Sequence, residues 1–254
     1  MDAFVNHKIE NGLATIQFYH PAHNSLPGFL LKKLATTIDE LGQDDRAKII
    51  LLTADGEKTF CAGASFDELS SIQDLETGKN FFSGFANVIL AIRNCPKIIL
   101  CRIHGKAIGG GVGLAAAADY AFATKYASIR LSELAVGIGP FVIGPAVERK
   151  MGTSAFQMMA LNPDEWQTAE WAKQKGLYNE VFESGQQLDD YILHFSNKLL
   201  SYNPQALYKL KTVFWEGTEN WDQLLFERAA ISGELVLSEY CKKAIEEFKM
   251  KAKG

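Results

Sequence analysis

Four glycines in five positions, between an apolar run and an alanine-rich run, constrain the fold of this chain more than any other feature. A buried strand is predicted at residues 97–103 and a helix at residues 114–118, with the glycine turn at 109–113 between them. Such a turn leaves backbone N–H groups without partners at the helix N-terminus, where the helix dipole favours negative charge. Because glycine lets a ligand approach the backbone closely, the turn predicts a site for an anion or for an oxygen that becomes one.

Hydrophobic periodicity divides the chain into an α/β part and a helical part. Strands are predicted at 4–10, 13–19, 48–53, 97–103, 119–123, 128–131 and 177–182. Helices are predicted at 29–41, 65–71, 80–94, 114–118, 146–151, 154–161, 169–175, 188–201, 204–215, 221–238 and 238–251. Loops are expected at 54–64 and 135–145, and a polar, mobile connector at 72–78. We therefore expect an α/β core over residues 1–190 and a helical region over 191–254 that covers this core or a neighbouring subunit.

Composition excludes several classes of protein. The 254 residues are 47% hydrophobic and 22% charged, as in globular proteins, and no apolar run is long enough to cross a membrane. The net charge of −4 argues against a nucleic-acid partner. The four cysteines (Cys61, Cys95, Cys101 and Cys241) lack the spacing of a zinc site or a disulfide framework. We expect buried thiols, no metal, and a cytoplasmic location without a secretory leader.

Two interpretations of the glycine turn compete. Residues 111–116 fit the dinucleotide pattern G-x-G-x-x-A, and Glu133 follows at about the distance of a ribose-binding acid. However, the glycine strand is the fourth or fifth of the chain, and the segments after it are too short for further βα units. A second loop, residues 60–69, also follows a strand and opens a helix. The amides of Ala64 and Gly110 could then converge on one oxygen as an oxyanion hole.

The two loops together resemble the crotonase (enoyl-CoA hydratase/isomerase) superfamily. The similarity rests on Phe-Cys-Ala-Gly-Ala at 60–64, the glycines at 105 and 109–111, Asp119, and the loop from Ser132-Glu133 through Gly137 to Pro140. The resemblance implies repeated ββα units, a C-terminal helical trimerisation region, and a homotrimer or dimer of trimers. It also implies an acyl-CoA thioester whose oxygen lies between the amides of Ala64 and Gly110, with CoA as part of the substrate and no separate cofactor.

The acid and base residues separate members of this superfamily, and this chain is similar to the single-glutamate type. Two-glutamate hydratases carry one Glu at the position of Gly113 and a second at the position of Glu133. A single carboxylate can move a proton from the α-carbon to the γ-carbon, which is the reaction of a Δ3,Δ2-enoyl-CoA isomerase. The run Gly137–Val142, which contains Phe141, also resembles the mitochondrial isomerases of the family.

The residues around Glu133 in the sequence suit a catalytic base. Five apolar side chains follow it closely: Leu134, Val136, Ile138, Phe141 and Val142. If they also surround Glu133 in space, desolvation raises its pKa towards neutrality, so that it can both accept and donate a proton. A surface acid at a helix N-terminus is the competing interpretation.

Further site residues and two alternatives follow from the resemblance. Gly113, Phe141 and Leu69 are expected to line the substrate pocket, and the residues expected at the CoA moiety are Ala62, Phe248 and Lys251. The first alternative is a hydratase for a short or branched enoyl-CoA (methylglutaconyl-CoA-like), in which Gly113 leaves room for water or for an acyl branch. The second is a family member that binds CoA esters or RNA without turnover, and the acidic balance argues against RNA.

Overall fold

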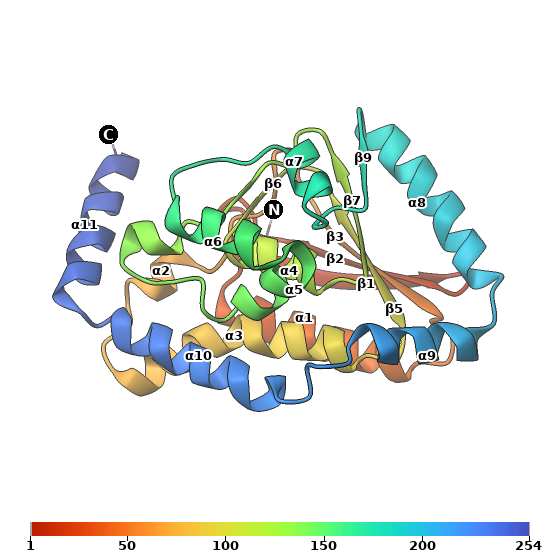
Figure 1. Cartoon of the computed structure of the whole chain (residues 1–254), viewed down its shortest axis with the longest axis horizontal. Coiled ribbons are helices and arrows are strands. Elements are labelled where there is room, and N and C mark those ends of the chain that lie inside the picture. Colours follow the sequence, from red (N-terminus) through yellow and green to blue (C-terminus); the bar gives the residue numbers. More distant parts are fainter. Residues whose placement is uncertain (1, 254) are drawn as a thin grey trace.

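The structure, a computed structural model, describes the backbone of residues 2–253 and the side chains of residues 2–247. A six-stranded sheet and a three-stranded sheet lie among helices (Figure 1). The strands are β1 (Phe4–Glu10), β2 (Leu13–Tyr19), β3 (Ile49–Ala54), β4 (Thr59–Cys61), β5 (Ile98–Ile103), β6 (Lys106–Ile108), β7 (Tyr120–Thr124), β8 (Ile129–Arg130) and β9 (Glu180–Phe182).

Helices account for most of the remaining chain. They are α1 (Gly28–Gln43), α2 (Phe66–Leu69), α3 (Leu75–Asn94), α4 (Gly110–Ala117), the 3₁₀ helix η1 (Glu133–Val136), α5 (Gly144–Met151), α6 (Thr153–Leu161), α7 (Ala169–Gln174), α8 (Gly185–Leu200), α9 (Pro204–Phe214), α10 (Trp221–Leu235) and α11 (Glu239–Lys253). The predicted core boundary at residue 190 falls inside α8.

The large sheet has the order β1-β2-β3-β5-β7-β9. Strands β1 and β2 form an antiparallel hairpin, and all further pairs are parallel. The hairpin turns at Asn11 and Gly12, which both have positive φ, the conformation that an Asn-Gly pair favours. The other connections must cross from one end of the sheet to the other, which the helices and the second sheet accomplish.

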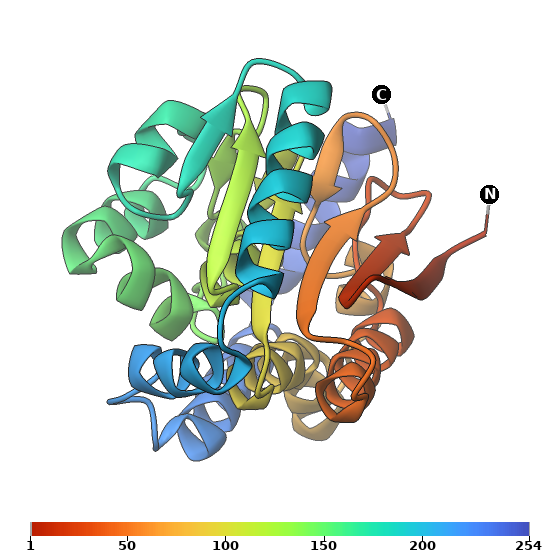
Figure 2. The ribbon, with the colours of Figure 1, turned by 90° about the vertical axis from the view of Figure 1, so that its right-hand side faces the viewer.

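Both faces of the large sheet are covered, which explains why its inner strands are almost entirely apolar. On β3 and β5, Ile49, Leu51, Ile98 and Leu100 pack with Leu188 and its neighbours on α8. The alternate residues of the same strands point into the main core with α1 and α3. In Figure 2, α8 crosses the sheet in front of its strands, and α1 and α3 lie below them.

The small sheet, β4-β6-β8, confirms the expected repeat. Three successive units each give one strand to the large sheet and the next strand to the small sheet: β3 with β4, β5 with β6, and β7 with β8. Helices follow each pair. Because the three short strands are parallel, their carboxyl ends lie at one edge of the small sheet, and the loops of the candidate site leave from that edge.

Two sequence predictions need correction here. The connector expected at 72–78 is largely helical, because α3 begins at Leu75 behind a capping box formed by Asp74 and Thr77. The loop expected at 54–64 contains β4, and the glycine turn is preceded by a separate strand, β6. Both strands have three residues, too few for hydrophobic alternation to reveal them.

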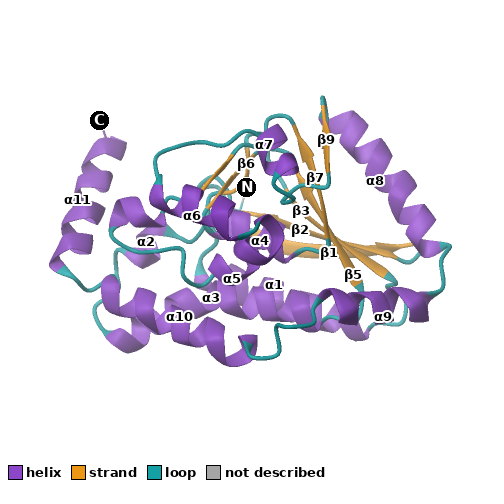
Figure 3. Cartoon of the chain, viewed as in Figure 1, coloured by secondary structure: helices purple, strands orange, loops and turns teal. Residues whose placement is uncertain are grey.

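The C-terminal helices pack on the core in two places. Lys211 of α9 forms a buried ion pair with Asp119, with 2.9 Å between Nζ and Oδ2 and both side chains 3% exposed. Helix α10 packs closely along α3, where the backbones meet at Gly78 and Gly233. Helices α1, α3 and α10 run side by side below the large sheet, and α11 stands at the end where α2 lies (Figure 3).

Candidate active site

The loops after β4 and β6 lie against each other, as the two-loop pattern predicted. A Cβ placed on Gly63 would lie 3.5 Å from the amide nitrogen of Gly110 and 3.2 Å from the carbonyl oxygen of Ile108. A Cβ on Gly111 would lie 2.5 Å from the carbonyl oxygen of Cys61. Glycine is required at these contacts because any larger residue would push the two loops apart.

The amides of Ala64 and Gly110 are available as donors. Neither donates a hydrogen bond to any atom of the part of the chain that the structure describes. The amide of Gly110 is free because it begins α4. The Ala64 loop is held in place by Leu26, whose amide donates to Gly63 O (2.7 Å) and whose carbonyl accepts from Ser65 N (3.3 Å). Two free amides on fixed, adjacent loops form an arrangement suited to a developing oxyanion.

The carboxyl group of Glu133 lies against the glycine turn. A Cβ on Gly109 would lie 2.8 Å from Glu133 Oε1, and Gly109 has a φ of +52°, which side chains rarely tolerate. The turn is tied to strand β8, which ends three residues before Glu133, because the amide of Gly109 donates to Arg130 O at 2.9 Å. The base candidate and the oxyanion candidates, far apart in sequence, are therefore brought together.

The surroundings of Glu133 favour its neutral form. The residue as a whole is partly buried, but Oε2 is buried and has no hydrogen-bond partner in the described residues. Burial raises the pKa of Glu133 to about 7, against smaller opposing effects of its own amide, Arg130 and the Ser132 amide. At neutral pH both protonation states are populated, which is the condition for a group that takes and returns a proton.

Helix η1 sets the direction of Glu133. It ends at Gly137, which has the left-handed conformation (φ 79°), and the amide of Ile138 donates back to Glu133 O at 3.0 Å. The first turn of α11 covers this end, because a Cβ on Gly137 would lie 2.8 Å from the ring of Tyr240 and 3.3 Å from Cys241 Cα. The last helix therefore supports the segment that carries the base.

The expectation that Gly113 leaves room for a water or an acyl branch is wrong. A Cβ on Gly113 would lie 2.5 Å from Cγ2 and 2.8 Å from Cβ of Ile143, so the side chain of Ile143 fills this space. Gly113 is itself buried in α4. The physical reason for glycine here is the close approach of α4 and the segment that begins α5.

The other two predicted pocket residues lie in different surroundings. Leu69 is 9% exposed and belongs to an apolar cluster between α2, η1 and the last two helices, which includes Ile138, Val236, Cys241 and Ile245. Phe141 turns its ring onto Gly139 of its own loop, where a Cβ would lie 2.5 Å from the ring. The cluster around Leu69 is an apolar wall beside the segment that carries Glu133.

Sequence reasoning missed Phe85 and Ile143, which hold the glycine turn from two sides. The ring of Phe85, on α3, lies directly against Gly110 and leaves no space for a Cβ there. Only a general signal was present: Phe85 falls on the buried face of an amphipathic helix. Which core residue touches a catalytic loop is set by tertiary packing, which periodicity does not reveal.

Of the predicted CoA-binding residues, Ala62 is the one whose side chain the structure describes. The side chains of Phe248 and Lys251 lie beyond the described residues. Ala62 donates its amide to Asn24 O at 3.4 Å, and Asn24 in turn donates to Asp55 O and Thr59 O. A cleft of about 250 Å³ opens beside Asn24, next to the Ala62 loop, lined by Tyr19, His20, Pro21, His23, Asn24, Asp55, Gly56, Glu57, Lys58 and Thr59.

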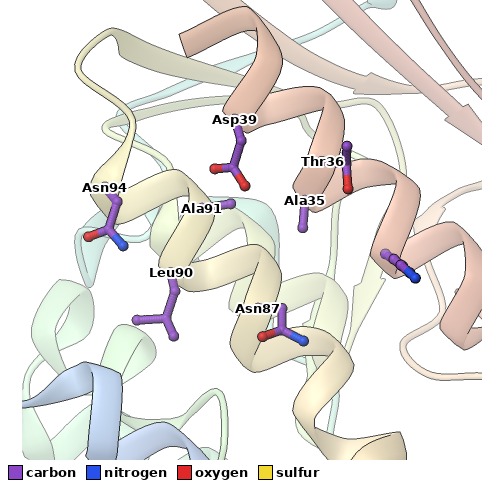
Figure 4. A pocket seen from close by; sticks show the side chains of 8 residues that line it. Ala35, Thr36, Asp39, Asn87, Leu90, Ala91 and Asn94 are labelled. Atoms are coloured by element: carbon purple, nitrogen blue, oxygen red, sulfur yellow. The ribbon is translucent and has the colours of Figure 1, made fainter. Parts of the chain in front are cut away.

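A second groove lies away from these loops. It has a volume of about 330 Å³ and runs between α1 and α3 (Figure 4), lined by Lys32, Ala35, Thr36, Asp39, Asn87, Leu90, Ala91 and Asn94. None of the candidate catalytic residues lines it.

Other functional groups are sparse among the described residues. In residues 2–247, no cluster of three His, Cys, Asp or Glu side chains is arranged to hold a metal ion. The four cysteines are unpaired and buried, as predicted. The described helices include none long and apolar enough to cross a membrane. One carboxyl group beside two free amides is an arrangement that can support proton transfer.

Comparisons with known proteins find related sequences and a shared fold. A family model described as enoyl-CoA hydratase/isomerase matches residues 8–253. The mitochondrial methylglutaconyl-CoA hydratase of Mus musculus is 30% identical over 200 residues, covering 77% of this chain and 63% of that protein. The short-chain-enoyl-CoA hydratase of Clostridium acetobutylicum is 27% identical over 247 residues, covering 96% and 94%. The crystal structure of an enoyl-CoA hydratase from Bacillus halodurans shares the fold, with a TM-score of 0.88 at 22% identity, covering 96% of this chain and 99% of that one.

Proposed function

Because the chain belongs to the enoyl-CoA hydratase/isomerase family, we propose that it is an acyl-CoA enzyme, and that its reaction is Δ3,Δ2-enoyl-CoA isomerisation. CoA is part of the substrate, and no separate cofactor takes part. The observation that carries the proposal is the position of one buried carboxyl group, Glu133, against the turn that presents the free amide of Gly110.

The proposed reaction moves one proton between two carbons. Glu133 removes a proton from C2 of the 3-enoyl thioester, and the electron pair shifts onto the thioester oxygen as a dienolate. The amides of Ala64 and Gly110 donate to this oxygen and stabilise the new charge more than they stabilise the substrate. Glu133 then returns the proton to C4, which moves the double bond from C3–C4 to C2–C3. The pKa of about 7 for Glu133 supports both steps.

Hydration of an enoyl-CoA is the second candidate, favoured by the names of two relatives. It would require Glu133 both to activate a water and to supply the proton for the α-carbon. In two-carboxylate hydratases the position of Gly113 holds the second acid, whereas here Ile143 occupies the adjoining space. Steric closure at Gly113 therefore supports isomerisation over hydration.

We also propose that the chain forms a trimer. Helix α9 exposes a row of apolar side chains on one face, Leu210, Val213 and Phe214, and Tyr208 on another, each about half exposed. On α6, which lies on the same side of the molecule (Figure 2), Leu161 is 71% exposed. Exposed apolar side chains gathered on one side of the molecule support a protein interface, and a second copy of the chain is the partner that the family suggests.

One assay separates the candidate reactions. Purified protein is mixed with 3-hexenoyl-CoA and, separately, with crotonyl-CoA, and the absorbance of the conjugated thioester is followed. We expect a gain with 3-hexenoyl-CoA that the Glu133→Gln variant abolishes, and no change with crotonyl-CoA. Loss of absorbance with crotonyl-CoA in the wild type but not in the variant would replace isomerisation by hydration. No change with either substrate would contradict both.

A further inference from the structure

Arg130 is a cation near the proposed base without a carboxylate partner. It is the last residue of β8 and lies three positions before Glu133. Its Nε is buried and has no hydrogen-bond partner in the described residues. None of the ion pairs found between described residues includes Arg130. A buried donor on a guanidinium group costs free energy unless something accepts its hydrogen bond.

The indole of Trp166 holds the guanidinium group in place. The Cζ atom of Arg130 lies 4.7 Å from the centroid of the Trp166 ring. Lys106, at the start of β6, has its Nζ 4.9 Å from the same centroid. A guanidinium group on an aromatic ring keeps its edge free for a planar anion, and its fork of donors matches a carboxylate.

Arg130 is coupled to the proposed base. The charge of Arg130 is one of the smaller effects that lower the pKa of Glu133. Arg130 and Glu133 are nevertheless not an ion pair, since no nitrogen–oxygen distance between them is within 4 Å. The backbone carbonyl of Arg130 accepts from the amide of Gly109 (2.9 Å), the residue against which the Glu133 carboxyl group lies. Arg130 is therefore fixed beside the proposed site without being neutralised by the carboxyl group that reacts.

We propose that Arg130 binds a second carboxylate at the far end of the acyl group, so that the preferred substrate is an unsaturated dicarboxylic acid joined to CoA through one carboxyl group. This inference rests on the proposed function, because it places the acyl group beside Glu133. The carboxylate accepts from Arg130 and supplies the partner that its donors lack. The side chains that form the apolar wall around Leu69 cannot pair with a carboxylate, whereas the Arg130 guanidinium can.

A matched pair of substrates tests the proposal. In 3-hexenoyl-CoA and 3-hexenedioyl-CoA the double bond and the chain length are the same, and a terminal methyl group in one is a carboxylate in the other. For the wild type we expect a larger kcat/KM with 3-hexenedioyl-CoA. The Arg130→Gln variant should lose about 10- to 100-fold in kcat/KM with this substrate and less than about threefold with 3-hexenoyl-CoA. Arg130→Lys, which keeps the charge, should restore part of the loss.

Lys106→Gln is the control for charge alone, because it removes the other cation that contacts Trp166. It should leave the preference between the two substrates unchanged. Equal losses with both substrates in Arg130→Gln, or an equal change of preference in Lys106→Gln, would overturn the proposal.

Binding measurements keep this test independent of turnover. The saturated esters adipoyl-CoA and hexanoyl-CoA differ by the same carboxylate, and their affinities can be compared by calorimetry. We expect adipoyl-CoA to bind at least tenfold more tightly to the wild type, and Arg130→Gln to remove this difference. If adipoyl-CoA shows this preference while neither 3-hexenoyl-CoA nor 3-hexenedioyl-CoA reacts, the proposed isomerisation is refuted and the role of Arg130 stands. Equal affinities of the wild type for the two esters would refute the role of Arg130 whatever the reaction.

Discussion

The carboxyl group of Glu133 shows how a single residue acquires a function from its surroundings. In the sequence it is one acid among 30 Asp and Glu residues, and its apolar neighbours predicted that desolvation would raise its pKa. The structure buries Oε2 without a partner and raises the pKa to about 7. Of the apolar neighbours named from the sequence, Leu134 is 42% exposed and contributes little to this burial. The contact with the glycine turn contributes burial that the local sequence does not reveal.

Stability should depend on pH through Glu133. Its pKa in the folded chain, about 7, lies above the ordinary value of 4.5. The stabilisation of the protonated form is complete below about pH 4.5 and is lost as the pH rises through about 7. Relative to Glu133→Gln, the wild type should therefore lose roughly 3 kcal/mol of unfolding free energy between about pH 4.5 and pH 8. Urea denaturation of both proteins across this range measures it, and parallel pH curves would contradict the assignment.

The packing at Gly113 gives a second prediction at this scale. Gly113→Ala should destabilise the fold by about 1–3 kcal/mol, because the new methyl group meets Ile143. Ile143→Ala removes the nearer of the two contacting atoms, so the double variant should lose less than the sum of the single changes. Chemical denaturation of the four proteins completes the cycle. Additive losses would show that Ile143 does not fill this space.

The site could be predicted from the sequence only where glycines and the carboxyl group mark it. The loops at 60–64 and 109–111, with Glu133, are recognisable because close backbone contact demands glycine and proton transfer demands an acid. The amides of Ala64 and Gly110 carry no side-chain signature of their own. Ile143, Phe85 and Arg130 could not be found, because their roles come from contacts across the fold rather than from spacing along the chain.

At the scale of elements, long periodic segments were predictable and short ones were not. Strands β1, β2 and β3 were identified from the hydrophobic pattern of the sequence. The three-residue strands β4 and β6 were not, although they position both loops of the candidate site. Their pairing is set by the larger sheet beside them, and no local pattern in the sequence specifies it.

Helix α9 is attached to the core through the buried ion pair between Lys211 and Asp119. The Asp119 carboxylate also accepts hydrogen bonds from Ile99 N (2.7 Å) and from Trp215 Nε1 (3.1 Å), so three residues depend on it. Lys211→Met should cost about 3–5 kcal/mol, because it leaves the carboxylate buried and unpaired. Thermal or chemical denaturation measures the loss. A change of less than about 1 kcal/mol would show that the pair does not hold α9 in place.

For the whole molecule, the exposed apolar row on α9 leads to a test of assembly. Val213 on α9 is 55% exposed, and Leu193 on α8 is 59% exposed on another face. Val213→Glu places a charge in the proposed interface and should shift the protein from trimer towards monomer, as measured by light scattering. Leu193→Glu is the matched control and should leave the mass unchanged. A wild type that is monomeric at micromolar concentration would contradict the proposed trimer.

Enolate formation beside Glu133 is the central claim, and hydrogen exchange tests it without reference to any later step. A saturated thioester such as hexanoyl-CoA has α-protons but no double bond to move or hydrate. Incubated with the protein in D₂O and followed by mass spectrometry, it should gain deuterium at C2. Glu133→Gln should reduce the rate at least about 100-fold while hexanoyl-CoA still binds. Exchange at the wild-type rate in Glu133→Gln, or no exchange in a wild type that binds the ester, would contradict the account.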